Sequence, residues 1–246
     1  LTMSLNRMKN QMMLTVAFAM TVASSAVNAG EISGQVKLNG TPPKEIKIKY
    51  DALCGKLNAA GGFTRHYVVS KEGGLANVFV YLKEAPAGQT FEVPAKKPIL
   101  DQVKCFYEPY VMGVMTGQEF TIRNSDPLMH NVHALPKVAG NKEFNIGQPV
   151  KGMTKTARFD KREVLVKFKC DVHPWMFAYV GVMDHPYFAV TGKDGKFKLP
   201  GDIPAGTYTL VAHHLKSGVQ EQEVTIAAGD KKELTFTMEP KARARR

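Results

Sequence analysis

The sequence predicts an all-β protein, and three observations support that class. After residue 30 the chain consists of short segments in which β-branched and aromatic residues alternate with polar ones, the pattern of half-buried strands. Turn-forming residues separate these segments, and the chain contains 21 glycines and 14 prolines. No stretch beyond residue 30 keeps a long amphipathic helical period. A soluble, turn-rich β-protein is therefore expected.

Residues 1–29 are expected to form a secretory signal peptide. Arg7 and Lys9 precede an apolar run that ends in Val-Asn-Ala before Gly30, which gives a basic region, a hydrophobic stretch and a small-residue cleavage site. The run is shorter than the roughly 20 residues that cross a bilayer, so a retained anchor helix is the less favoured alternative. We expect a periplasmic or otherwise exported protein with no membrane span after cleavage.

Residues 30–184 are expected to form the first domain. Its middle section, residues 51–115, is less regular than the rest, and we expect long loops there. The strand candidates are ISGQVKL (32–38), NVFVYLK (77–83), EFTIRN (119–124), VLVKFK (164–169) and AYVGVM (178–183).

Residues 185–240 contain their own series of short strand candidates separated by turns, and we expect them to form a small β-sandwich. Residues 188–201 predict a hairpin with Asp194-Gly195 at its turn. Two further strands are expected on either side of a Gly-Asp turn at residues 229–230. A basic tail, residues 241–246, follows.

The chain has three cysteines, which in an exported protein suggests one disulfide and one thiol with another task. Cys170 lies in a cluster of potential metal ligands, so Cys54 and Cys105 are the expected disulfide pair. A second metal site that uses both is the alternative. On a chain-entropy treatment, closing a loop of that size stabilises the fold by roughly 4 kcal/mol.

The heptapeptide CDVHPWM, residues 170–176, places a thiol, an imidazole and a thioether three residues apart from one another. Thiolate and thioether are soft ligands, and a site of two histidines, one cysteine and a weak axial methionine selects copper and supports electron transfer. Cys170, His173 and Met176 can come from one loop between two strands. The second histidine must come from elsewhere, and His130 follows the strand EFTIRN. Its neighbour Asn131 is expected to form a hydrogen bond that joins the two loops.

The segment MHNVH followed by CDVHPWM resembles the cupredoxins, the blue copper proteins, and most closely the amicyanin type with its short Cys-x2-His-x2-Met loop. Phe168, two positions before the cysteine, is also similar to that pattern. The resemblance covers about residues 75–184. It implies a Greek-key β-sandwich, here with an N-terminal elaboration, and one copper ion. The ligands that it implies are His130, Cys170, His173 and Met176.

A weaker resemblance links residues 195–214 to carboxypeptidase-regulatory-like sandwiches of the transthyretin type. The whole arrangement is similar to exported proteins labelled methylamine utilisation proteins, a label that names no activity.

The function that we expect is one-electron transfer between redox partners, and we do not expect an enzyme. Copper oxidases need further histidine-ligated coppers, and the seven histidines include no His-x-His pair. A copper storage or delivery protein is one alternative, although no Met- and His-rich tract follows the signal. A structural or partner-binding β-protein with a Cys/His zinc site that includes His133 is another.

The expected partner is a redox protein, such as a c-type cytochrome or a periplasmic dehydrogenase. Without the signal the chain has 31 Lys and Arg against 22 Asp and Glu, a net charge of about +9 that would steer an acidic partner. No nucleic-acid-binding module is recognisable. Electrons are expected to leave through the imidazole edge of His173 at the surface, with Pro174 and Trp175 as an apolar rim. Internal packing of Trp175 is the alternative.

Overall fold

A computed structural model of the protein describes residues 29–242, and this part of the chain is almost entirely β. The expected signal peptide and the last four residues of the basic tail lie outside the described residues. The helix α1 (Ala52–Leu57) has six residues. In the described part of the chain, no helix has the length and apolar character needed to cross a membrane. The all-β class is confirmed.

Nine strands between residues 99 and 183 form the first sandwich. Its larger sheet has the order β5-β11-β10-β7-β8 and its smaller sheet the order β4-β3-β6-β9, and buried side chains from both sheets share one core. The strands are β3 (Ile99–Val103), β4 (Phe106–Glu108), β5 (Val111–Met115), β6 (Phe120–Asn124), β7 (His130–Leu135), β8 (Phe144–Gln148), β9 (Thr154–Ala157), β10 (Glu163–Lys169) and β11 (Phe177–Met183).

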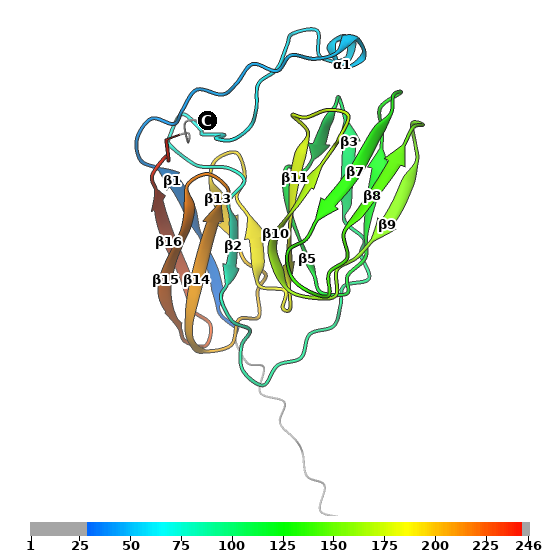
Figure 1. Cartoon of the computed structure of the whole chain (residues 1–246). Coiled ribbons are helices and arrows are strands. Elements are labelled where there is room, and N and C mark those ends of the chain that lie inside the picture. The colour runs from blue at the N-terminus through cyan, green and yellow to red at the C-terminus, as the bar shows by residue number, and fades with distance from the viewer. Residues whose placement is uncertain (1–28, 243–246) are drawn as a thin grey trace, which may run out of the picture.

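The other strands form a second sandwich beside the first (Figure 1). Its sheets have the orders β13-β1-β16 and β12-β2-β14-β15, and they share a separate core. The strands are β1 (Glu31–Leu38), β2 (Phe79–Leu82), β12 (Phe188–Val190), β13 (Lys196–Lys198), β14 (Gly206–His214), β15 (Gly218–Ile226) and β16 (Lys231–Met238).

The strand pairing corrects the expected division into residues 30–184 and 185–240. Strand β1 pairs in parallel with β16 along its whole length, and β2 pairs with β14. Two strands from the N-terminal part of the chain therefore complete the second sandwich. Ile32 and Val36 of β1 are fully buried against the same core as Phe236 of β16. Alternation identifies the buried face of a strand but not the strand beside it, so the sequence could not show this pairing.

The expected hairpin at residues 188–201 is also corrected. Its turn forms, with Gly195 at φ +77°, where an added Cβ would lie 2.4 Å from the Val36 carbonyl oxygen. However, β12 pairs with β2 while β13 pairs with β1, so the two strands belong to opposite sheets. Strands β15 and β16 are likewise consecutive in sequence but belong to opposite sheets.

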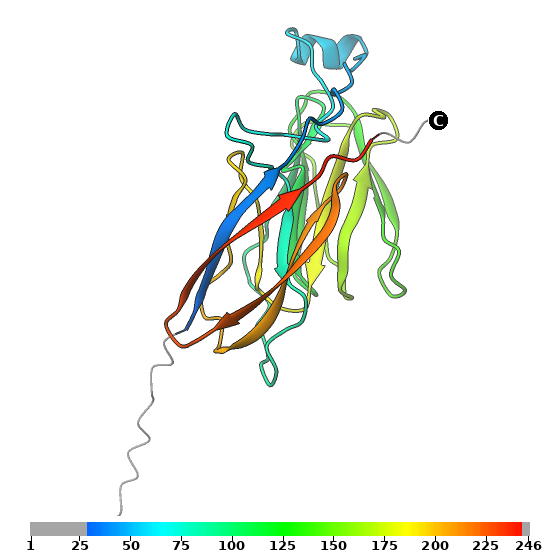
Figure 2. The same cartoon turned by 90° about the vertical axis from the view of Figure 1, so that its left-hand side faces the viewer.

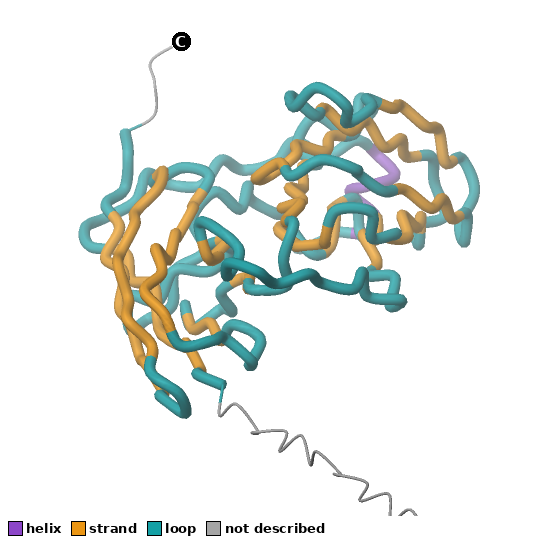
Figure 3. Tube along the Cα trace, turned by 90° about the horizontal axis from the view of Figure 1, so that it is seen from below, coloured by secondary structure: helices purple, strands orange, loops and turns teal. Residues whose placement is uncertain are grey.

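Between β1 and β2 the chain leaves the second sandwich and crosses to the end of the first (Figures 1 and 2). We call residues 45–66 of this crossing the cap. Two extended stretches of the cap pair through Ile48 N–H to the Gly62 carbonyl (2.9 Å) and Thr64 N–H to the Ile46 carbonyl (2.9 Å). Helix α1 lies between these stretches, and the view from below places it within the outline of the first sandwich (Figure 3).

A covalent bond holds the cap in place. Cys54 of α1 and Cys105, between β3 and β4, form a disulfide, and both are fully buried. This confirms the expected pair. Asn58 donates to the Lys104 carbonyl (2.9 Å), and Arg65 donates to the Tyr107 carbonyl (2.9 Å). Helix α1 is thereby fixed over the end of the first sandwich.

Candidate metal centre

Three side chains that can bind a metal converge at the end of the first sandwich that the cap covers. His130 begins β7, Cys170 directly follows β10, and His173 lies in the loop before β11. One ligand atom from each lies within 4.8 Å of the others. The two Nδ1 atoms are 3.0 Å apart, and Cys170 Sγ is 3.6 Å from His173 Nδ1. All three residues are buried.

The loop of residues 170–176 is closed by its own backbone. Cys170 N–H donates to the Met176 carbonyl (3.2 Å), and Met176 N–H donates to the His173 carbonyl (2.9 Å). The Met176 side chain is fully buried in the core of the same sandwich. The structure therefore brings the thiol and both imidazoles together and holds the thioether inside.

The spacing of these atoms fits a single metal ion. Metal–nitrogen and metal–sulfur bonds of about 2.0–2.3 Å allow one ion to contact two nitrogens 3.0 Å apart and a sulfur 3.6 Å from one of them. Burial opposes ionisation of Cys170, but hydrogen bonds with His130 and His173 outweigh it and lower the thiol pKa to about 6. A thiolate with two imidazoles is a donor set for copper or zinc rather than for magnesium or calcium.

Asp126 fixes the orientation of His130. Its carboxylate lies 2.8 Å from His130 Nε2 and also accepts the backbone N–H groups of Lys104 (2.6 Å) and Cys105 (2.7 Å). Burial lowers the pKa of His130, but the hydrogen bonds to Asp126 and Cys170 give a net rise. Since a carboxylate can only accept, Nε2 carries the proton and Nδ1 is left for a metal.

Asp51 makes an ion-pair contact with His173. Its carboxylate lies 3.1 Å from His173 Nε2 and accepts the N–H groups of Leu53 and Cys54 at the start of α1. Sequence reasoning missed both aspartates. Asp126 could have been found from its place four residues before His130, whereas Asp51 carries no local signal except its position as a helix N-cap.

The expectation that the His173 imidazole reaches the surface is wrong. His173 is only 3% exposed, because Asp51 and the rest of the cap lie against its outer edge. Sequence patterns alone do not show which distant segment covers a loop.

Pro174 is exposed, but Trp175 is half-buried and packs beneath the cap. The Trp175 indole N–H donates to the Cys105 carbonyl (3.0 Å), and its ring meets Tyr50 edge-on at 5.3 Å. The ring also lies 5.3 Å from that of His173. Pro174 and Trp175 therefore do not form a rim around an exposed imidazole.

Asn131 connects the two loops that carry the candidate ligands. Its Oδ1 accepts the Asp171 N–H (2.6 Å) and lies 3.2 Å from Cys170 Sγ, while its Nδ2 donates to Asn145 Oδ1 (2.7 Å). Tyr107 adds a second connection, since its hydroxyl donates to the Asn131 carbonyl (2.6 Å).

His133 lies outside the group of candidate ligands. Its Nδ1 is 3.0 Å from Asp171 and its Nε2 is 2.6 Å from Glu143, both at the surface. Of the metal-binding groups that the described residues offer, none includes His133. A zinc site completed by His133 is therefore not assembled in the structure.

No family model and no curated protein matches the chain. Among solved structures, it is similar to a mutant of amicyanin in its oxidized state (28% identity, 37% of this chain and 86% of that one, TM-score 0.31). It is also similar to a purple cupredoxin from Nitrosopumilus maritimus (24% identity, 34% of this chain and 95% of that one, TM-score 0.28). A Cu-containing nitrite reductase from Thermus scotoductus SA-01 is similar at 18% identity over 42% of this chain and 25% of that one, with a TM-score of 0.34.

Proposed function

We propose that this protein is an exported type 1 copper protein that carries single electrons between redox partners. The observation that supports the proposal most strongly is the donor set itself. Cys170 Sγ and the Nδ1 atoms of His130 and His173 are buried together, and each imidazole lies next to an aspartate carboxylate. Met176 supplies the thioether from the same loop, as a weak axial ligand.

The preformed shape of the site suits electron transfer. The carboxylates of Asp51 and Asp126 and the amide of Asn131 hold the ligand side chains from outside, so their positions need not change when the metal gains or loses an electron. Bound copper would supply the one-electron redox couple. His173 is only 3% exposed beneath the cap, which hinders access by a substrate, so we propose a carrier rather than an enzyme.

Electrons need another exit because the cap covers His173. Val172 is 50% exposed and Pro174 is exposed, so the tip of the ligand loop presents apolar surface within a few residues of Cys170. We propose this tip as the contact for the redox partner. A small apolar contact suits short-lived redox encounters, whose interfaces bury less than about 1,200 Å².

A copper storage or delivery protein is the second candidate. The observation that favours a carrier is burial: the candidate ligands are at most 3% exposed and lie beneath a disulfide-bonded cap, which hinders transfer of the metal to another protein. A delivery site needs accessible ligands.

The test is a titration of the purified protein with Cu(II). We expect one copper per chain, an intense visible thiolate-to-Cu(II) charge-transfer band, and reversible bleaching by ascorbate. Release of the copper to a chelator should be slow compared with reduction. A colourless complex, or rapid release in both oxidation states, would contradict the carrier.

A further inference from the structure

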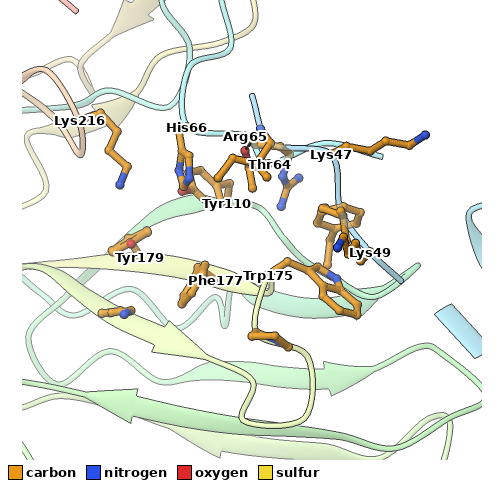
Figure 4. A pocket seen from close by; sticks show the side chains of 15 residues that line it. Lys47, Lys49, Thr64, Arg65, His66, Tyr110, Trp175, Phe177, Tyr179 and Lys216 are labelled. Atoms are coloured by element: carbon orange, nitrogen blue, oxygen red, sulfur yellow. Dashed lines mark hydrogen bonds between the residues drawn. The ribbon is translucent and has the colours of Figure 1, made fainter. Parts of the chain in front are cut away.

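A cavity of about 540 Å³ opens beside the ligand loop and lies outside the metal centre. It is lined by three parts of the molecule: the cap, the first sandwich with its ligand loop, and the turn after β14 of the second sandwich (Figure 4). Trp175 of the ligand loop forms part of its wall. This volume is within the range of small-molecule sites, which measure roughly 300–1,000 Å³.

One side of the cavity is aromatic. Tyr110, Trp175, Phe177 and Tyr179 lie together on the sandwich side (Figure 4), and the rings of Tyr110 and Tyr179 meet edge-on at 5.7 Å. Burial raises the pKa of both tyrosines, so the hydroxyls stay protonated and can donate hydrogen bonds. A flat apolar group can stack on these rings.

The charge around the cavity is positive. Of its fifteen lining residues, five are lysine or arginine and none is acidic. Burial is the largest cause that lowers the pKa of Lys167, and the charges of Lys169, Lys216 and Lys137 lower it further. Lys167 Nζ lies 4.7 Å from the centre of the Phe177 ring, so one charge sits directly on the aromatic side.

Within the described structure, Arg65 is the only lysine or arginine of the lining with an acidic partner, since it pairs with Glu108 outside the cavity. Its guanidinium covers the rings of Phe106 and Tyr110 at 4.7 and 5.1 Å. The described structure pairs neither Lys167 nor Lys216 with a carboxylate. Positive charge next to an aromatic surface is complementary to a flat anion and repels cations.

We propose that this cavity binds a small planar aromatic carboxylate, with its ring system against the aromatic side beside Tyr179 and its carboxylate at Lys167 and Lys216. The proposal does not depend on copper. It assigns a second, small-molecule site that touches the ligand loop through Trp175.

The chain contains a single tryptophan, which gives a direct readout. Its indole N–H produces one cross-peak in an ¹⁵N correlation spectrum, and ascorbate keeps any bound copper as diamagnetic Cu(I). We expect 2-naphthoate to shift this peak saturably, with a dissociation constant that calorimetry reproduces.

Two matched compounds separate the contributions of ring and charge. 2-Naphthalenemethanol has the ring without the charge, and inorganic phosphate has charge without the ring. Both should bind at least tenfold more weakly than 2-naphthoate at equal ionic strength. If phosphate binds as tightly as 2-naphthoate, the cavity is a general anion site. If the alcohol binds as tightly as 2-naphthoate, the cavity is a general apolar site. Either result would overturn the proposal, as would binding heat without a shift of the indole peak.

Variants locate the site. The double variant Lys167→Gln/Lys216→Gln should weaken the binding of 2-naphthoate about tenfold, because it removes two partly exposed ion pairs. The control Lys151→Gln/Lys155→Gln makes the same change in charge on exposed residues that do not line the cavity. Equal weakening by both pairs would show a nonspecific charge effect and contradict the proposal.

Discussion

Asp51 Oδ2 lies 3.1 Å from Nε2 of His173, and the same carboxylate caps the N-terminus of α1. One side chain therefore both caps the helix of the cap and contacts a candidate copper ligand. The carboxylate keeps its negative charge in the folded protein, because the N–H groups of Cys54 and Leu53 outweigh burial and lower its pKa.

Asp51→Asn tests this connection. Asparagine caps a helix as well as aspartate does, so the helix should persist while the negative charge is lost. A negative charge beside the metal favours Cu(II) over Cu(I), so its removal should raise the reduction potential while copper stays bound. Potentiometric titration measures the change, and thermal unfolding verifies that the cap is intact. An unchanged potential with an intact cap would show that Asp51 serves only the helix.

Cys170→Ser should abolish the visible charge-transfer band. The other two cysteines form the disulfide, so the described structure offers no second thiol to replace Cys170. The absorption spectrum of the copper-treated variant gives the result directly. A band of unchanged energy and intensity would mean that a different residue binds the metal.

Met176→Ala should retain copper and shift the reduction potential, since a weak axial ligand tunes the metal rather than holds it. The substitution also removes a fully buried side chain and should cost about 2–5 kcal/mol of unfolding free energy. Met183→Ala is the control, because Met183 is equally buried but packs in a different cluster. It should lower stability similarly and leave the potential unchanged; equal shifts in both variants would remove Met176 from the site.

Two substitutions on the ligand loop distinguish packing from partner contact. Trp175→Lys should lower the unfolding free energy by about 2 kcal/mol, because it removes the bond to the Cys105 carbonyl and the contact with Tyr50. Val172→Lys should slow electron exchange with a c-type cytochrome without lowering stability, since Val172 is 50% exposed.

Stopped-flow rates and chemical unfolding measure the two effects. Val219→Lys is the matched control for Val172→Lys, because Val219 has the same exposure but lies on β15. If Val172→Lys leaves the rate unchanged, the partner binds another face.

The disulfide should hold the cap against the end of the first sandwich. Replacing Cys54 and Cys105 with serine removes a cross-link over 51 residues and should cost roughly 4 kcal/mol. Amide hydrogen exchange in residues 45–66 should then become faster than exchange in β10 and β11. Exchange that accelerates equally in all these segments would show that the bond stabilises the whole fold rather than the cap.

His214 should make stability depend on pH. Burial and the charge of His213 lower its pKa to about 4, below the ordinary value of about 6.5. The unfolded chain therefore binds more protons between pH 6.5 and 4, so stability falls as the pH decreases through this window, by up to roughly 3 kcal/mol. His214→Asn should reduce the slope of unfolding free energy against pH in copper-free protein. An unchanged slope would assign the effect to other groups.

The sequence predicted more of the site than of the fold around it. Cys170 and His173 are close in sequence, and the strands beside them alternate clearly, so their placement on one loop followed from local pattern. The contact between Asp51 and His173 did not follow from local pattern, because it joins a short N-terminal helix to a distant loop. The partner of β1 was equally hidden, since parallel pairing with β16 spans most of the chain.

The pairing of β1 with β16 has a consequence for biosynthesis. Residues 99–183 are inserted within the chain of the second sandwich, so the first sandwich is complete in sequence long before β16 is made. It can fold as soon as its own strands are available, because all of their ladder partners lie within that segment. Strand β1 must instead wait, with an unpaired edge, until residues 231–238 arrive. We therefore expect the half that holds the candidate metal centre to fold first, and the half that begins and ends the described chain to close around a finished insert.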